Sequence, residues 1–170
     1  MKFNKIFCIG FNKTGTTSLA DFFTGHDIKT LTGAIIWYFT AQNKLVDNNG
    51  KVINDSKKFD EYQAFTDGFE NLIMNNDDIV LPDIEYLNKK YPNSLFIYQT
   101  RPLRKWLLSR LNNGYHFFYT NNKKCEKIDE VYEILKYWTN LRNYWYGYIL
   151  DYFTQSRQPA PQLLKMDISD

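Results

Sequence analysis

The chain has 170 residues, of which 44% are hydrophobic and 18% aromatic, and these values fit one compact domain with a bulky core. Its formal net charge is +2, which is too small for a protein that binds nucleic acid by neutralising a run of phosphates. We therefore expect no nucleic acid as a partner, while a local cluster of cations around one small anion is compatible with this charge.

The chain contains two cysteines, Cys8 and Cys125, which are too distant in sequence to form a metal-ligand motif or a disulfide framework. Cys8 lies within an apolar segment, which predicts a small buried thiol. The first residues show no signal-peptide pattern, and no run of about eighteen apolar residues occurs. These features predict a cytoplasmic protein without a membrane span.

The first elements alternate between strand and helix. Lys5–Ile9 is an apolar run that ends at Gly10, which predicts a buried strand followed by a turn. The pattern over Thr16–Phe23 predicts a helix, and a second helix is expected over Leu31–Leu45. Residues 47–58 are polar and turn-rich, and they predict a surface loop.

The middle of the chain repeats this alternation. A short strand is expected at Gln63–Thr66 and a helix at Asp83–Tyr91. Ser94–Thr100 is rich in aromatic and β-branched residues and predicts a strand. Pro102 follows it at a position suited to the first turn of a helix, which we expect to extend to about Leu111.

The C-terminal part begins with apolar residues at three- and four-residue steps, which predict one long amphipathic helix over Lys127–Phe153. Leu163–Asp167 predicts a last strand. Because strands alternate with helices, we expect an α/β, three-layer P-loop fold in which a short parallel sheet is flanked by helices. Residues 1–170 show no internal repeat and are expected to form a single domain.

The segment Gly10-x-x-x-x-Gly15-Thr16-Thr17 has the glycine spacing of a phosphate-binding P-loop. Glycines let the backbone curl around an anion, the amide N–H groups then point at phosphate oxygens, and the following helix adds its partial positive charge. The hydroxyls of Thr16 and Thr17 add further donors. The segment therefore predicts a phosphate site, with a plain glycine-containing turn as the alternative.

The lysine of this segment is displaced from its position in nucleoside triphosphatases. In those proteins a lysine directly follows the second glycine and reaches the terminal phosphates. Here Thr16 holds that position, and the lysine is Lys13, two residues before Gly15. A lysine inside the loop is directed at another part of the ligand, which argues against ATP or GTP hydrolysis and its magnesium-binding acidic residue.

Two segments of the chain together resemble a known family. Lys13–Leu19, after an apolar strand, resembles the 5′-phosphosulfate loop of sulfotransferases that use 3′-phosphoadenosine 5′-phosphosulfate (PAPS). The family's second signature is a strand that ends in arginine, followed by a helix with a serine eight residues later, and Arg101 and Ser109 fit it. The resemblance covers residues 5–24 and 83–111 well and the rest in outline.

This resemblance implies transfer of a sulfuryl group from PAPS to a hydroxyl or amine of a small-molecule or glycan acceptor, with adenosine 3′,5′-bisphosphate (PAP) as product and no metal. It implies that Lys13 neutralises the charge on the oxygen that leaves the sulfur. Arg101 and Ser109 would bind the 3′-phosphate, for which a planar guanidinium is suited. The implied donor-binding residues are Asn12, Lys13, Thr14, Gly15, Thr16, Thr17, Arg101 and Ser109.

The reaction also needs a base that accepts a proton from the acceptor. Asp67 is our first candidate, because it ends a predicted strand and such ends face the ligand crevice of a parallel sheet; a cap or turn residue is the alternative. His26 and His116 lie in or near polar stretches, where histidines are usually solvated. The cationic residues of the helix after Arg101 are expected on a solvated face: Arg104, Lys105 and Arg110.

Many sulfotransferases have a later Arg/Lys-Gly loop that closes over the adenine, and this chain shows no counterpart. The chain also stops directly after its last predicted strand, where relatives usually continue. A short variant, a truncated chain and a domain that lost activity all fit this observation. Two other functions also stay open, a P-loop kinase that uses ATP and a non-catalytic nucleotide-binding domain that kept the fold.

Overall fold

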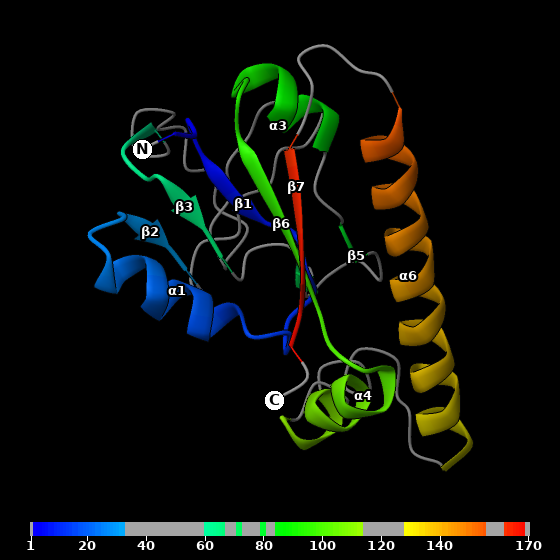
Figure 1. Cartoon of the computed structure of the whole chain (residues 1–170). Coiled ribbons are helices and arrows are strands. Elements are labelled where there is room, and N and C mark those ends of the chain that lie inside the picture. Colours follow the sequence, from blue (N-terminus) through cyan, green and yellow to red (C-terminus); the bar gives the residue numbers. More distant parts are fainter. Residues whose placement is uncertain are drawn as a thin grey trace.

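The structure is a computed structural model that describes residues 2–32, 60–66, 71–72, 79–80, 84–113, 128–155 and 162–168. Within these ranges, the central feature is a five-stranded parallel sheet with the order β2-β3-β1-β6-β7 (Figure 1). Its strands are β1 (Ile6–Cys8), β2 (Thr30–Leu31), β3 (Ala64–Phe65), β6 (Leu95–Thr100) and β7 (Gln162–Asp167). A two-stranded antiparallel sheet consists of β4 (Asn71–Leu72) and β5 (Ile79–Val80).

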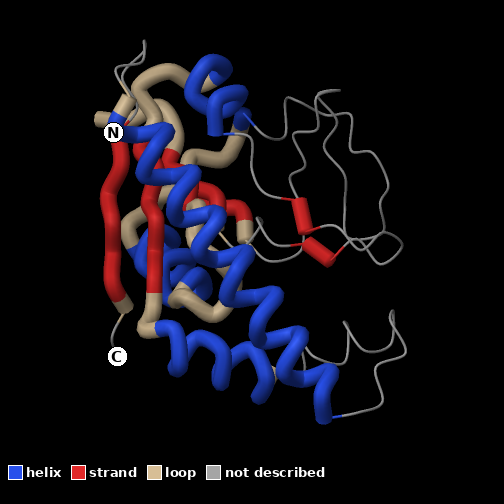
Figure 2. Tube along the Cα trace, turned by 90° about the vertical axis from the view of Figure 1, so that its right-hand side faces the viewer, coloured by secondary structure: helices blue, strands red, loops and turns tan. Residues whose placement is uncertain are grey.

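Helices cover both faces of the central sheet. They are α1 (Thr16–Gly25), α3 (Ile84–Lys90), α4 (Leu103–Asn112) and α6 (Ile128–Thr154). Buried residues of α1 pack on one face of the sheet, and those of α3, α4 and α6 belong to the cluster on the other face. Figure 2 shows α6 lying along the sheet, with α4 below it at the carboxyl ends of the strands. The predicted three-layer α/β architecture is confirmed.

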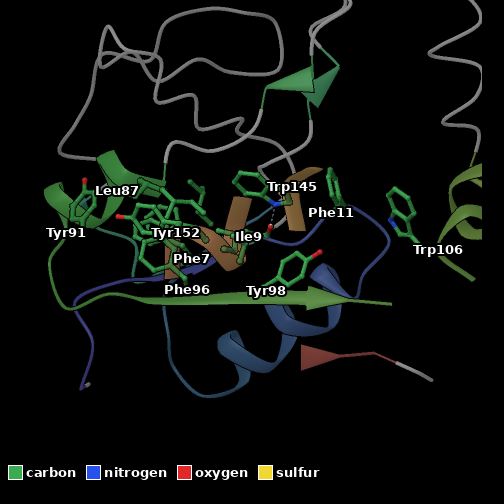
Figure 3. Packing of buried hydrophobic residues seen from close by; sticks show 14 of the residues in the cluster. Phe7, Ile9, Phe11, Leu87, Tyr91, Phe96, Tyr98, Trp106, Trp145 and Tyr152 are labelled. Atoms are coloured by element: carbon green, nitrogen blue, oxygen red, sulfur yellow. Dashed lines mark hydrogen bonds between the residues drawn. The ribbon is translucent and has the colours of Figure 1, made fainter. Parts of the chain in front are cut away.

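The two faces follow from the alternation of side chains along a strand. In β1, Ile6 and Cys8 belong to the cluster that α1 covers, whereas Phe7 belongs to the cluster on the α6 side. Phe7 lies between two aromatic rings of neighbouring strands, with ring centroids 5.2 Å from Phe65 and 5.4 Å from Phe96. Figure 3 shows Phe7 and Phe96 in this core. Cys8 is fully buried, as its apolar surroundings in the sequence predicted.

The observed helices and strands agree with most of the predicted ones, apart from shifts at their ends. One prediction is wrong at its start: Leu31 does not begin a helix but lies in β2, where it pairs with Phe65 of β3. A strand of two residues shows no periodicity in the sequence, and its pairing partner is more than thirty positions away. The rest of the helix expected over Leu31–Leu45, and the loop expected at 47–58, lie outside the described residues.

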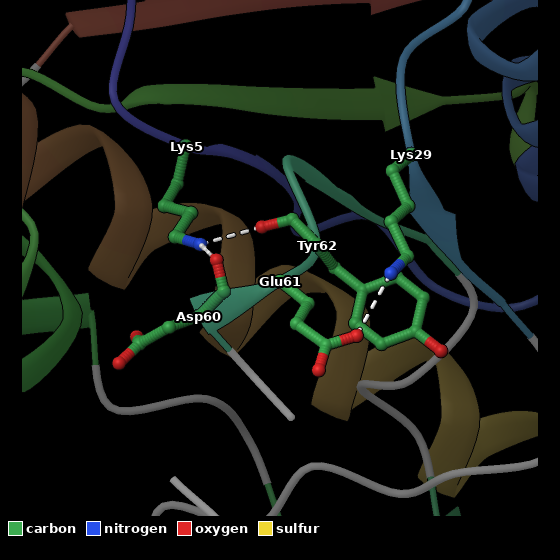
Figure 4. A network of polar contacts seen from close by, with 5 residues as sticks. All are labelled: Lys5, Lys29, Asp60, Glu61 and Tyr62. Carbon is green, nitrogen blue, oxygen red and sulfur yellow. Dashed lines mark hydrogen bonds and ion pairs between the residues drawn. The ribbon is translucent and has the colours of Figure 1, made fainter. Parts of the chain in front are cut away.

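Lys5, which directly precedes β1 and is buried, links the amino end of β1 to the segment that precedes β3. Its ammonium donates to the backbone carbonyl of Asp60, at 2.9 Å, and to that of Tyr62 (Figure 4). Burial lowers the pKa of Lys5, and the nearby Asp60 carboxylate opposes this shift. Lys29 and Glu61 form an exposed ion pair beside it at 2.8 Å, which contributes little to stability.

Candidate functional site

The segment between β1 and α1 begins at Gly10, which lies against β6. Its amide donates to Oε1 of the buried Gln99 at 3.0 Å. A Cβ atom at position 10 would lie 2.2 Å from the backbone oxygen of Gln99, so only glycine fits this close approach of two backbones. Gly10 is therefore required by the packing of the strand end and not only by the curl of the loop.

The two residues that give the loop its turn have left-handed backbone conformations. Lys13 has a φ of 69° and Gly15 a φ of 80°. Such a conformation costs a residue with a side chain roughly 1–2 kcal/mol, whereas glycine adopts it freely. The strained residue of this loop is therefore the lysine that the sequence singled out, and strain of this kind is often found at functional sites.

Two tryptophan side chains hold the loop from the α6 side of the sheet. The indole N–H of Trp145 donates to the carbonyl of Ile9 at 2.9 Å (Figure 3), and that of Trp106 donates to the carbonyl of Asn12 at 2.9 Å. Within the loop, the Thr14 hydroxyl donates to the carbonyl of Phe11. These bonds fix the loop backbone through contacts within the protein itself, which favours a preformed shape for a ligand.

The N-terminus of α1, where the loop ends, has no side-chain cap. Gly15 is its N-cap and has no side chain to cap the first turn, and the first turn contains no acidic residue. The first amide N–H groups of a helix have no partner within the helix and carry a partial positive charge. With ten residues in the helix, this end offers the donors that an anion needs.

The loop and the Arg101 segment meet at one cavity of about 230 Å³. Its lining residues are Asn12, Lys13, Gly15, Thr16, Thr17, Arg101 and Ser109. The two segments come together because β1 and β6 are adjacent parallel strands, with Cys8 paired to Ile97, so that their carboxyl ends lie at the same edge. Two of the lining residues are cationic and none is acidic, which suits the cavity to an anionic ligand. We call it the donor cavity below, after the PAPS donor that the sequence resemblance implies.

The remaining predicted site residues lie elsewhere or outside the description. Thr14 is buried and does not line the cavity, so it could contribute only its backbone. Asp67 and His116 lie outside the described residues. His26 follows the far end of α1, about 15 Å along the helix axis from the loop, and its ring bonds to the carbonyl of Phe22. The position of His26 excludes it as a base at the donor cavity.

One prediction for α4 is wrong. Arg104 and Lys105 are exposed, but Arg110 is only 1% exposed and lies between two indole rings. Its guanidinium carbon is 5.0 Å from the ring centroid of Trp106 and 4.3 Å from that of Trp138. Trp106 lies four residues earlier on the same helix face, and the second ring comes from α6, so cation–π contacts replace water around this charge.

Four supporting residues were not predicted from the sequence. Gln99, Trp106 and Trp145 bond to the loop, and Arg142 bonds to Thr100 and Arg101 at the end of β6. Gln99 left one signal, because it is a polar residue inside an apolar strand and lies two positions before Arg101. The tryptophans fit the apolar stripes of their helices and gave no indication that their N–H groups bond to the loop. Such contacts depend on how the helices are placed along the sheet.

Within the described residues, no helix is long and apolar enough to cross a membrane, and no three His, Cys, Asp or Glu side chains are grouped to hold a metal ion. No curated protein and no solved structure gave a significant match to the chain. A family model described as "Sulfotransferase domain" matches residues 5–167, which include both segments that line the donor cavity. Since this match spans far more than half of the sequence, the chain belongs to the sulfotransferase domain family, whose members transfer sulfuryl groups.

Proposed function

We propose that this chain transfers a sulfuryl group from PAPS to a hydroxyl or amine of a small-molecule or glycan acceptor and releases PAP. One observation carries the proposal: a single cavity joins Lys13 and the open N-terminus of α1 to Arg101 and Ser109, with no carboxylate in its lining. A donor with phosphate groups at both its 5′ and 3′ ends needs two such anion subsites. A donor with one phosphate chain needs only the first.

In this proposal the 5′-phosphosulfate lies at the N-terminus of α1. The amide N–H groups of the loop and the hydroxyls of Thr16 and Thr17 hold its oxygens. Lys13 stabilises the negative charge that develops on the bridging oxygen as the sulfur–oxygen bond breaks, and a preorganised cation is most effective at that point. Arg101 and Ser109 bind the 3′-phosphate. This scheme uses no metal ion.

The acceptor loses a proton as its oxygen or nitrogen attacks sulfur, and Asp67 stays our candidate for the base that takes it. The support comes from the strand that precedes it. β3 is parallel to β1, and Phe65 of β3 pairs with Phe7 of β1. The carboxyl end of β3 therefore lies at the same sheet edge as the loop. Asp67 follows this end by two residues in the sequence.

The binding step is tested by thermal shifts with PAP, with AMP, and with ATP plus magnesium. A ligand at about 100 times its Kd stabilises a protein by about 2.7 kcal/mol, which gives a clear shift. We expect selective stabilisation by PAP, loss of this selectivity in Arg101→Ala, and no loss in Arg104→Ala, a matched control because Arg104 is exposed on α4. A response to ATP with magnesium alone would indicate a kinase and refute the proposal.

Turnover is tested separately, by following PAP release from PAPS in the presence of hydroxyl- and amine-bearing acceptors. We expect acceptor-dependent release. A protein that binds PAP selectively but consumes no PAPS with any acceptor would be a non-catalytic domain, and the catalytic part of the proposal would then be wrong while its binding part stands.

A further inference from the structure

Arg142 of α6 is bonded to the end of the strand that carries Arg101. Its Nη2 atom donates to the hydroxyl oxygen of Thr100 at 3.0 Å and to the backbone carbonyl of Arg101 at 2.7 Å. These two acceptors lie where the chain leaves β6 and turns toward α4. One guanidinium group thus holds the backbone at the point from which the Arg101 side chain departs.

The same guanidinium also contacts the residue that holds the P-loop. Its central carbon lies 5.6 Å from the ring centroid of Trp106, and the indole of Trp106 donates to the carbonyl of Asn12. Arg142 is therefore linked to both segments that line the donor cavity. It bonds directly to the Arg101 backbone, and it contacts Trp106, which in turn bonds to the loop. Arginine suits this place because its planar group can donate hydrogen bonds and stack on an indole at once.

Arg142 does not line the donor cavity itself. It lines a neighbouring cavity of about 340 Å³, to which Arg101, Tyr146 and Lys165 also contribute. Arg101 is thus shared by both cavities, whereas Arg142 lines only the neighbouring one. Because Arg142 does not line the donor cavity, we expect it to act on a ligand there through the residues that it holds and not by direct contact.

We propose that Arg142 is a positioning residue for the donor, which fixes the backbone of Arg101 so that its guanidinium faces the 3′-phosphate subsite. This inference rests on the proposed function, because the 3′-phosphate is the group that Arg101 would bind. The physical basis is preorganisation: a side chain whose backbone is already fixed loses less conformational entropy when it binds. Hydrogen bonds from a charged donor are also stronger than neutral ones.

The experiment measures the affinities of PAP and AMP by calorimetry for the wild type, Arg142→Met and Arg142→Lys. We expect Arg142→Met to weaken PAP binding about ten-fold, which corresponds to about 1.4 kcal/mol, and to leave AMP binding within about two-fold. The affinity for AMP should be insensitive to this substitution because AMP lacks the 3′-phosphate. Arg142→Lys keeps the charge but not the planar fork, so its PAP affinity should lie between those of the wild type and Arg142→Met. If Arg142→Met does not fold, Arg142→Lys serves for the same test.

A double-variant cycle separates positioning from direct contact. If Arg142 acts through Arg101, then Arg142→Met should change PAP affinity by less than about two-fold in an Arg101→Ala background. An equal loss in both backgrounds would mean that Arg142 affects the ligand independently of Arg101, and it would overturn the inference. The matched control is Lys165→Met, because Lys165 lines the same neighbouring cavity but donates to the Tyr146 hydroxyl at 3.1 Å.

Lys165→Met should leave PAP affinity within about two-fold, since it does not hold the Arg101 backbone. A loss as large as that of Arg142→Met would show that the charge of the neighbouring cavity attracts the ligand, which contradicts positioning. The two levels of the proposal fail differently. A wild type that does not prefer PAP over AMP refutes the proposed function, whereas a wild type that prefers PAP and an Arg142→Met variant with unchanged affinity refute only the role of Arg142.

Discussion

The amide of Gly10 donates a buried hydrogen bond of 3.0 Å to the side chain of Gln99, and this bond holds the start of the loop between β1 and α1 against β6. Because β6 also ends in the segment that carries Arg101, this bond couples the two strands whose ends form the donor cavity. Gln99 reaches the loop only because position 10 has no side chain. The glycine of the motif thus has a structural task besides the anion binding that we propose for the loop.

Gly10→Ala tests this close contact. The new Cβ would lie 2.2 Å from a backbone oxygen, which cannot move without shifting β6. We expect a loss of about 1–3 kcal/mol in the free energy of unfolding, as for other overpacked sites, together with weaker PAP binding. Urea denaturation measures the first effect and calorimetry the second.

The control for Gly10→Ala is Gly147→Ala in the middle of α6. A Cβ at Gly147 would meet no atom within 4 Å. Alanine in a helix interior is more favourable than glycine by about 0.5–1 kcal/mol, so this variant should be more stable than the wild type. Equal effects of the two substitutions would contradict the assigned role of Gly10.

Trp145→Phe removes the donor that holds Ile9 at the end of β1. Phenylalanine keeps most of the buried aromatic surface but leaves the carbonyl of Ile9 without its indole partner. An unsatisfied buried acceptor costs about 1–3 kcal/mol, and we expect a loss of that size in urea denaturation. Tyr144→Phe, at an exposed position of the same helix, should stay within about 0.5 kcal/mol of the wild type. Unchanged stability of Trp145→Phe would show that this bond is dispensable.

The sequence predicts the residues that line the donor cavity better than it predicts the residues that support them. Gly15, Arg101 and Ser109 were recognisable because each belongs to a motif with fixed spacing, and the adjacency of β1 and β6 brings these motifs together. Arg110 and Arg142 were not recognisable as supporting residues. Their partners are indole rings and backbone atoms on other elements, and local charge patterns carry no information about such distant contacts.

Lys13 is tested by two substitutions that remove the same ammonium group. Lys13→Ala keeps a side chain in the left-handed conformation, whereas Lys13→Gly adopts a φ of 69° without strain. Both should lower PAPS turnover about 100- to 1,000-fold, the usual effect of losing one group that stabilises the transition state. Lys13→Gly should be more stable than Lys13→Ala by roughly 1 kcal/mol.

The comparison of the two Lys13 variants separates charge from loop shape. Turnover that survives in Lys13→Gly but not in Lys13→Ala would assign the effect to loop distortion, and Lys13 would lose its catalytic role. Lys105→Ala serves as the control for removal of a positive charge near the site, because Lys105 is exposed on α4 and does not line the donor cavity. Its turnover should match that of the wild type.

Cys8 gives the fold a dependence on alkaline pH that can be measured without any ligand. Burial raises the pKa of the Cys8 thiol from 9.0 to about 12, so the folded protein keeps this proton in a range where the unfolded chain loses it. The contribution of the thiol to stability is therefore fully present below pH 9 and is lost as the pH rises toward 12. Linkage sets the slope in this range at about 1.4 kcal/mol per pH unit.

The measurement is urea denaturation of the wild type and Cys8→Ala at pH 8, 9 and 10 under reducing conditions. Cys8→Ala lacks the titrating group, so the advantage of the wild type over the variant should shrink by about 1 kcal/mol between pH 9 and pH 10. Other alkaline groups, such as Tyr91 with its raised pKa, affect both proteins equally and cancel in the difference. A difference that stays constant over this range would mean that water reaches the thiol, and that the packing between β1 and α1 is looser than the buried side chains of this cluster indicate.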